Sequence, residues 1–195
     1  LDTEEFLALA HVHTHNIPSA RFAAETAIYD LLAQEAGIPL AKYLNSNSKT
    51  EVKINGINGV QLPGDGFQII KVKVGFLNLF DQIDQMEALT QSYGTDISFR
   101  LDANGVFDLP QAIRFCKEME KFNIDYIEQP LAADELIDLA ELRYHTEIPI
   151  AVDESITNLE SAEKIIEEQA ADVFILKPMI IGGFTECKKI IDITN

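Results

Sequence analysis

Short β-rich runs alternate with amphipathic stretches from residue 69 to the end of the chain, and this repeat limits the folds that the chain can adopt. The first member of each pair is rich in Ile and Val, as in "IIKVKVG", "DISFRLD" and "IPIAVDE". In the second member, such as "DLPQAIRFCKEMEKFN", apolar residues recur at spacings of three and four, which is typical of one face of a helix. Strands and helices that alternate at a constant unit length predict an α/β fold with a parallel sheet.

The first part of the chain has a different pattern. The stretch "IPSARFAAETAIYDLLAQEAG" predicts a helix to about Ala36, with Ser19 as its N-cap and Gly37 just after its end. A polar linker, "NSNSKT", then precedes a first strand, "EVKINGI", at 51–57. We therefore expect a helical segment at 1–48 that packs against, or leads into, the array of strands and helices at 49–195.

Four of the predicted strands end in a charged side chain. Asp102 ends "SFRLD", Glu128 ends "DYIE", Asp153 ends "IAVD" and Lys177 ends "VFILK", and each lies one strand–helix unit after the one before. The carboxyl ends of barrel strands are where barrel enzymes carry their chemistry. Three buried carboxylates close together are costly unless a cation neutralises them. Such oxygen ligands suit Mg²⁺, with Mn²⁺ as the alternative ion.

Two more lysines, Lys71 and Lys73, alternate onto one face of the strand before Asp102. With Lys177 they place an amine on each side of the predicted metal ion. Burial and nearby positive charge lower the pKa of an ammonium group, so that lysines in such a site could act as base and acid. The substrate that this arrangement predicts is a small carboxylate bound through the metal, with its α-proton made more acidic.

In order along the chain, "KVKVG", "RLDANG", "YIEQP", "AVDES" and "ILKP" resemble the enolase superfamily, in its muconate lactonizing enzyme subgroup. The resemblance spans residues 19–190. It implies a TIM-type (β/α) barrel that removes a proton α to a carboxylate, through an enediolate that Mg²⁺ stabilises. It also implies roles for the residues: Asp102, Glu128 and Asp153 as metal ligands, Lys73 and Lys177 as catalytic groups, and Lys71, Asn104 and Glu154 as supporting groups around them.

Within that subgroup the chain resembles the o-succinylbenzoate synthases of menaquinone biosynthesis. Arg100, the "DES" sequence and the phrase "LKPMIIGG" carry this likeness, although Arg100 could equally be a structural ion-pair partner. The implied reaction is that of a lyase: Lys73 removes the α-proton of a cyclohexadiene carboxylate, water is lost, and Lys177 stabilises the charge from the opposite face. Two alternatives stay open, namely a racemase or epimerase of dipeptides or N-acylamino acids, and a truncated fragment without catalysis.

The sequence also departs from the enolase pattern. We count six strands where a closed barrel has eight. The resemblance therefore implies that residues 49–195 form a catalytic but partial (β/α) barrel, and that residues 1–48 are a helical segment leading from a capping domain that is reduced to a remnant. The stretch "NGVQLPGDGFQ", between the first two strands, is too short for a crossover helix. Open sheet edges invite another chain, so a homo-oligomer is one way to cover them. The residues that would separate the alternative reactions belong to the seventh and eighth strands.

Composition excludes several other classes. The formal net charge of −17 argues against nucleic-acid binding, which requires a basic patch. No run of 18 apolar residues predicts a membrane span, and the acidic start "LDTEEFLALA" does not resemble a signal peptide. Cys116 and Cys187 are too few for a disulfide framework and are expected to be reduced thiols, which fits the cytoplasm.

Two further motifs have two interpretations each. In "HVHTH", three histidines at every second position would share a face if the segment were extended and could bind a transition metal; a solvated loop is the alternative. Gly182 and Gly183 precede a predicted helix. They could leave backbone N–H groups free for an anion, or simply form a turn.

Overall fold

The computed structural model describes residues 3–60 and 65–194, and the chain divides into two compact units. The first, here called the sheet unit, comprises the described residues of 53–156 and 163–175. The second, here called the helical unit, comprises the described residues of 1–52, 157–162 and 176–195.

The sheet unit contains six parallel strands whose spatial order is the same as their order in the sequence. This order requires that each strand returns to the same end of the sheet before the next begins, which is the connectivity of a (β/α) barrel. The predicted α/β class is therefore confirmed. The strands are β1 (Gly56–Ile57), β2 (Ile69–Lys73), β3 (Ser98–Asp102), β4 (Ile124–Glu128), β5 (Ile150–Val152) and β6 (Val173–Phe174).

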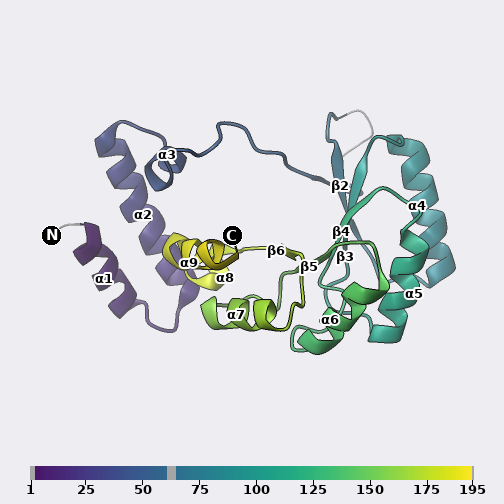
Figure 1. Cartoon of the computed structure of the whole chain (residues 1–195). Helices are drawn as coiled ribbons and strands as arrows, with labels where there is room; N and C mark the ends of the chain where they lie inside the picture. The colour runs from purple at the N-terminus through teal and green to yellow at the C-terminus, as the bar shows by residue number, and fades with distance from the viewer. Residues whose placement is uncertain (1–2, 61–64, 195) are drawn as a thin grey trace. The chain divides into compact units, whose positions relative to one another are not determined.

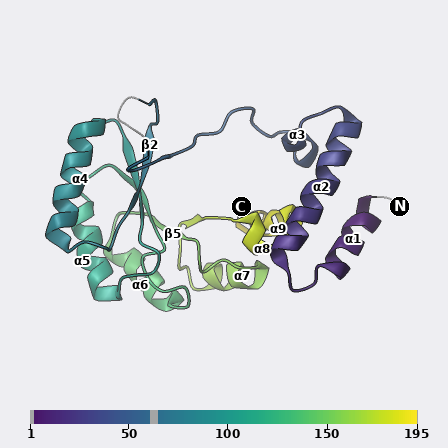
Figure 2. The same cartoon turned by 180° about the vertical axis from the view of Figure 1, so that it is seen from behind.

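Helices connect the strands from β2 onward, and Figures 1 and 2 show α4, α5 and α6 on one face of the sheet. Local signals explain where two of them begin. The Asn78 side chain accepts a hydrogen bond from the N–H of Asp81, and Asp108 forms a reciprocal capping box with Gln111. The connecting helices are α4 (Leu79–Tyr93), α5 (Leu109–Met119), α6 (Leu136–His145) and α7 (Leu159–Glu167).

One face of β2 is apolar and buried, and the other face carries the two lysines of the candidate site. Successive side chains of a strand point to opposite faces. Ile70 and Val72 are fully buried on one face, with Leu101 of β3 likewise fully buried. Lys71 and Lys73 project from the other face, and their side chains are 25% and 55% exposed. The apolar face of the sheet thus holds the core and leaves the opposite face for charged groups.

The first strand is shorter than predicted, because only Gly56 and Ile57 pair with a neighbour. Gly56 lies opposite Ile70, and β2 begins at Ile69, so residues 51–54 extend past the end of the strand that pairs with β1. The connection to β2 contains no helix among its described residues, and part of "NGVQLPGDGFQ" lies outside the described residues.

In the helical unit, α2 packs against α1, α3, α8 and α9. Rings contribute to this packing: the Phe184 ring lies 5.5 Å from that of Phe22, centroid to centroid. The predicted helix and its stop are confirmed, since Gly37 adopts a left-handed φ of 69°. The predicted Ser19 cap is wrong, because Ile17 stands at the cap and Pro18 opens the helix. The helices are α1 (Thr3–His13), α2 (Pro18–Ala36), α3 (Leu40–Leu44), α8 (Pro178–Ile181) and α9 (Phe184–Thr194).

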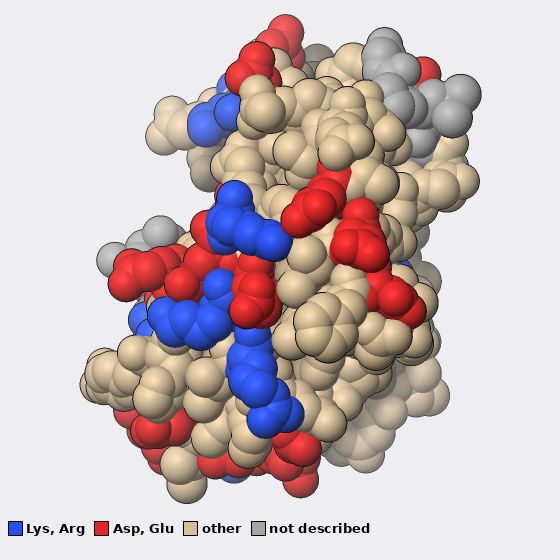
Figure 3. All heavy atoms as spheres, turned by 90° about the vertical axis from the view of Figure 1, so that its right-hand side faces the viewer, with Lys and Arg blue, Asp and Glu red and all other residues tan. Residues whose placement is uncertain are grey.

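The face of the sheet unit shown in Figure 3 carries acidic and basic side chains side by side. Ion pairs also form at the end of α5: Lys117 Nζ lies 3.0 Å from Glu120 Oε1, and Lys121 Nζ lies 3.2 Å from Glu87 Oε1 of α4. These two lysines are thus paired with neighbouring carboxylates. Within the described part of the chain, every helix is too short or too polar to cross a membrane.

Candidate active site

The carboxyl ends of β2, β3 and β4 bring three of the predicted residues into register. Lys73 pairs with Asp102 across β2 and β3, and Asp102 pairs with Glu128 across β3 and β4. Asp153 follows β5 directly. The three carboxylates are almost fully buried, with exposed fractions of 2%, 1% and 5% in chain order. The spacing of one charged group per strand–helix unit therefore does place buried acids at the carboxyl ends of neighbouring strands.

Both lysines of β2 contact these acids. Lys71 Nζ donates a hydrogen bond of 2.7 Å to Glu128 Oε2 and lies 2.8 Å from Asp102 Oδ2. Lys73 Nζ donates to the same Asp102 oxygen at 2.6 Å, and also to Asn104 Oδ1. Lys71, which the resemblance gave as a supporting group, thus bridges two of the predicted metal ligands itself.

Burial and ion pairing act in opposite directions in this cluster. Burial lowers the pKa of Lys71, but hydrogen bonds to Asp102 and Glu128 outweigh it, so the pKa is raised. Burial raises the pKa of Asp102, but hydrogen bonds from both lysines outweigh it, so the pKa is lowered. The expectation that a lysine pKa falls here is therefore not met for Lys71, because the acids are its direct partners.

The pKa of Glu128 is raised, first because of burial and then because of the charges of Asp102 and Asp153. Its second oxygen, Oε1, is buried and makes no hydrogen bond. A buried carboxylate oxygen without a partner, beside two other acids, is what a divalent cation would satisfy. The donor set, its burial and this oxygen therefore fit Mg²⁺.

The three acids do not stand as a ready-made metal site. Among residues 3–60 and 65–194, no three Asp, Glu, His or Cys side chains are grouped closely enough to hold an ion. In this arrangement the two lysines pair with one carboxylate oxygen of Asp102 and one of Glu128. The assignment of Asp102, Glu128 and Asp153 as ligands stays a prediction.

Asn104 and Glu154 lie beside this cluster. Asn104 Nδ2 donates a 2.8 Å hydrogen bond to Glu154 Oε1, and the backbone N–H of Asn104 donates to Asp102 Oδ1 at 3.3 Å. Asn104 adopts a left-handed φ of 48°, a conformation that asparagine tolerates better than most residues. This turn places its side-chain oxygen against Lys73 and its amide against Glu154, so that it links β2 to the end of β5.

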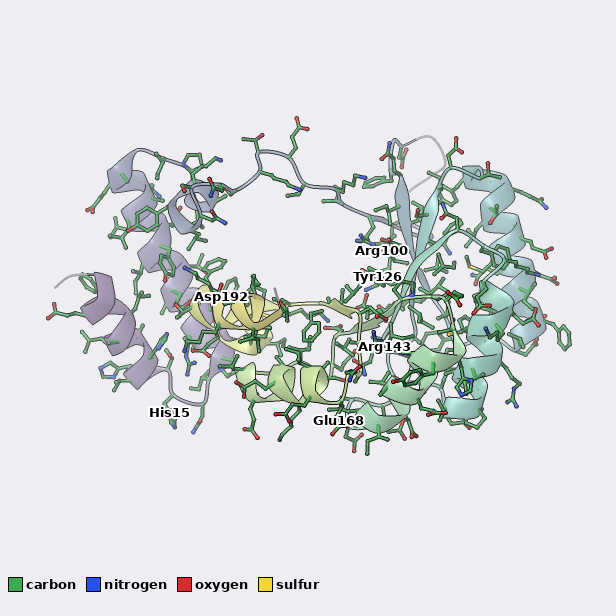
Figure 4. All side chains as sticks on the ribbon, in the orientation of Figure 1. His15, Arg100, Tyr126, Arg143, Glu168 and Asp192 are labelled. Carbon is green, nitrogen blue, oxygen red and sulfur yellow. The ribbon has the colours of Figure 1, made fainter. Side chains whose placement is uncertain are left out.

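Arg100 has other partners. Its Nε donates a 2.8 Å hydrogen bond to Asp125 Oδ2, and one terminal nitrogen donates to Asn55 Oδ1 at 3.1 Å. Figure 4 shows Arg100 next to Tyr126, whose ring centroid lies 4.9 Å from the guanidinium carbon. In this structure Arg100 therefore acts as an ion-pair partner within the sheet, which is one of the two roles that the sequence left open.

Sequence reasoning missed Gln129, which organises the ends of β4 and β5. Its side chain is buried, and its Oε1 accepts hydrogen bonds from the N–H groups of Asp153 at 3.0 Å and Ser155 at 3.2 Å. Its Nε2 donates to Ser155 Oγ and to the carbonyl of Leu131. A polar residue directly after a buried acidic strand end was the available signal. Gln129 holds the backbone of a predicted metal ligand.

Lys177 belongs to the helical unit, whereas the acids and Lys73 belong to the sheet unit. It follows β6 by three residues and stands at the N-cap of α8. Its carbonyl accepts hydrogen bonds from the N–H groups of Ile180 at 2.8 Å and Ile181 at 3.0 Å. The predicted placement of Lys177 opposite Lys73 stays a prediction.

The histidine motif does not form the extended face that a metal site would need. Helix α1 continues through His13, so His11 and His13 point about 200° apart around its axis. His11 Nε2 instead lies 2.8 Å from Glu25 Oε1 of α2. The hypothesis that this motif binds a transition metal required an extended segment. That requirement is not met, because the segment is helical through His13.

Comparisons with known proteins identify the family of the chain. The profile of the family "Enolase C-terminal domain-like" matches residues 60–195. An L-amino acid-D/L-Glu epimerase of Francisella philomiragia is 33% identical over 97% of this chain and 56% of its own length. The o-succinylbenzoate synthase of Bacillus subtilis is 29% identical over 89% of this chain and 48% of its own length.

A solved structure, that of a dipeptide epimerase from Cytophaga hutchinsonii complexed with Mg and the dipeptide D-Ala-L-Val, superimposes with a TM-score of 0.87. It is 30% identical to this chain, all of which it matches, over 55% of its own length. The chain thus spans about half the length of the curated relatives and the solved structure that it matches.

Proposed function

The chain belongs to the enolase C-terminal domain-like family, and we propose that it carries most of a Mg²⁺-dependent site that epimerises a dipeptide or an N-acylamino acid. The observation that carries this proposal is the contact of Lys73 Nζ with Asp102, 2.6 Å apart, inside a group of buried acids. An amine next to a predicted metal ligand is placed to reach the α-carbon of a carboxylate that the metal would bind. Relatives that are named epimerases support the choice of reaction.

Asp102, Glu128 and Asp153 would hold the ion, which when bound would stabilise negative charge on the substrate carboxylate. The residues of the chain perform the proton transfers. In its neutral form Lys73 removes the α-proton from one face, and the electron pair of the broken C–H bond moves onto the carboxylate. Lys177, in its ammonium form, donates a proton to the opposite face. One C–H bond breaks and one forms, so that the α-carbon is inverted, and the reverse reaction exchanges the two roles.

Dehydration to o-succinylbenzoate is the second candidate, and the synthase of Bacillus subtilis among the relatives supports it. That reaction begins with the same removal of an α-proton. It differs in that a leaving group is expelled, so that only one lysine must transfer a proton. The two candidate reactions therefore share Lys73 and the acids, but only epimerisation requires Lys177 to transfer a proton.

The test uses the natural protein that contains this chain, with Mg²⁺, in deuterium oxide. We expect dipeptides or N-acylamino acids to gain deuterium at the α-carbon, and the epimer to appear. Removal of Mg²⁺ by a chelator should abolish both. Conversion of the cyclohexadiene carboxylate, without α-exchange of any amino-acid derivative, would replace the epimerase by the synthase.

The variant Lys73→Arg tests the base. Arginine stays protonated in proteins, so it cannot remove a proton even if it keeps the ion pair to Asp102. We expect turnover to be lost while Mg²⁺ binding, measured by calorimetry, is retained. Turnover near the wild-type rate in Lys73→Arg would refute the assignment of Lys73.

A further inference from the structure

We propose that Glu25 of α2 is a positioning residue for Lys177, an inference that rests on the proposed epimerase function. All of the residues involved lie in the helical unit. Glu25 is fully buried, although it is a carboxylate in a helix interior. A buried carboxylate is costly unless it is hydrogen-bonded or paired, so its partners indicate what it holds in place.

The partners of Glu25 lie on both sides of α2. Glu25 Oε2 accepts a 3.1 Å hydrogen bond from the backbone N–H of Thr185, in the first turn of α9. Glu25 Oε1 lies 2.8 Å from His11 Nε2 of α1. The positive end of the α9 dipole also favours an anion at this point. The carboxylate of Glu25 is therefore an anion at the start of α9, next to the glycine pair for which the sequence offered anion binding as one interpretation.

Gly183 shows how closely the carboxylate approaches the backbone. A Cβ at Gly183 would lie 2.3 Å from Glu25 Oε2, which no real contact allows, and the φ of Gly183 is 119°. Only glycine permits both the conformation and the approach. The segment from Gly183 to Thr185 is thus clamped against α2.

The hydrogen bonds of the single turn of α8 connect the segment 183–185 to Lys177. The N–H groups of Gly182 and Gly183 donate to the carbonyl of Pro178, at 2.9 and 2.8 Å, and those of Ile180 and Ile181 donate to the carbonyl of Lys177. The backbone of Lys177 is therefore tied to the same turn that Glu25 holds at its other end. A misplacement of about 1 Å can slow a reaction by about 100-fold, so the anchor should matter for Lys177 and not for Lys73.

The test is the asymmetry between the two proton transfers. Each epimer of the substrate loses its α-proton to one of the two lysines, and the epimer that still exchanges in Lys177→Ala is the one that Lys73 deprotonates. In Glu25→Leu we expect α-deuterium exchange of the Lys177 epimer to fall about 10- to 100-fold relative to that of the Lys73 epimer. Loss of folded protein would lower both rates equally, so their ratio reports only on positioning.

Two further variants complete the experiment. Glu25→Gln can accept from Thr185 and donate to His11, so we expect it to restore the ratio, and Glu35→Leu, on the exposed surface of α2, should leave it unchanged. Equal loss of both exchange rates in Glu25→Leu would reduce Glu25 to a structural role. A wild-type protein that exchanges neither epimer would instead refute the proposed function.

The anchor itself is tested without any substrate. In Glu25→Leu, backbone amides of 180–185 should exchange with deuterium oxide faster than in the wild type, as measured by mass spectrometry, while amides of β3 keep their protection. Unchanged protection of 180–185 would overturn the positioning role even if the enzyme were an epimerase.

Discussion

The substitution Gln129→Leu probes the link between β4 and β5 that holds Asp153. Leucine has nearly the volume of glutamine, so the change removes hydrogen bonds without opening a large cavity. It leaves three buried backbone groups without their partner: the N–H groups of Asp153 and Ser155 and the carbonyl of Leu131. Each buried polar group left unpaired costs about 1 kcal/mol or more, so we expect the free energy of unfolding to fall by about 3 kcal/mol.

Urea denaturation followed by circular dichroism measures this loss. The matched control is Gln91→Leu, because Gln91 is an exposed glutamine of α4 and its replacement should change stability by less than about 0.5 kcal/mol. We also expect Gln129→Leu to weaken Mg²⁺ binding, since the backbone of a predicted ligand loses its support. If the two variants unfold at the same urea concentration, the argument that Gln129 organises this edge of the sheet is wrong.

Two further predictions concern glycine and cysteine positions. Gly183→Ala should lower the free energy of unfolding more than Gly94→Ala does. In both variants the alanine must adopt a strained positive φ, which costs about 1–3 kcal/mol, but only the Cβ at position 183 would collide with Glu25. Equal decreases in the free energy of unfolding, measured in urea, would contradict this clash. Burial raises the pKa of the Cys116 thiol from 9.0 to about 12, so its stabilising effect is complete below pH 9 and is lost as pH rises toward 12, by about 1.4 kcal/mol per pH unit. Urea midpoints at pH 8 and pH 10.5 should therefore differ less in Cys116→Ala than in the wild type, and an identical difference would show that this thiol does not titrate in that range.

The strand ends were predictable because a parallel sheet aligns them. Once strands recur at a constant spacing, the acids that end β3 and β4 must lie near one another, and the register of Asp102 opposite Glu128 follows. The partner of each side chain was less predictable. Lys71 and Lys73 share a face of β2, but which lysine reaches Glu128 depends on distances of a few ångströms that the alternation of residues does not contain.

Other differences arose where a neighbour decides the local structure. The residues before Gly56 have the composition of a strand, but β2 offers them no partner. The histidine motif alternates as a strand would, yet α1 continues through it. Gln129 escaped notice because its importance lies in the backbone groups that it satisfies, which belong to a different strand end. In each case the deciding contact is distant in the sequence.

The position of Lys177 depends both on the repeat along the sequence and on contacts between residues that are distant in the sequence. Its place one strand–helix unit after Asp153 is a local repeat, and that repeat identified it. Its backbone, however, is held by a turn that ends against Glu25, which stands about 150 residues earlier in the chain. Helix α2, which belongs to the segment that the sequence presented only as a remnant leading from a capping region, therefore contacts the segment that carries a candidate catalytic lysine. It follows that removing α1 and α2 should affect the proton transfer assigned to Lys177 before that assigned to Lys73, because Lys73 is held by β2 and by the acids of its neighbouring strands.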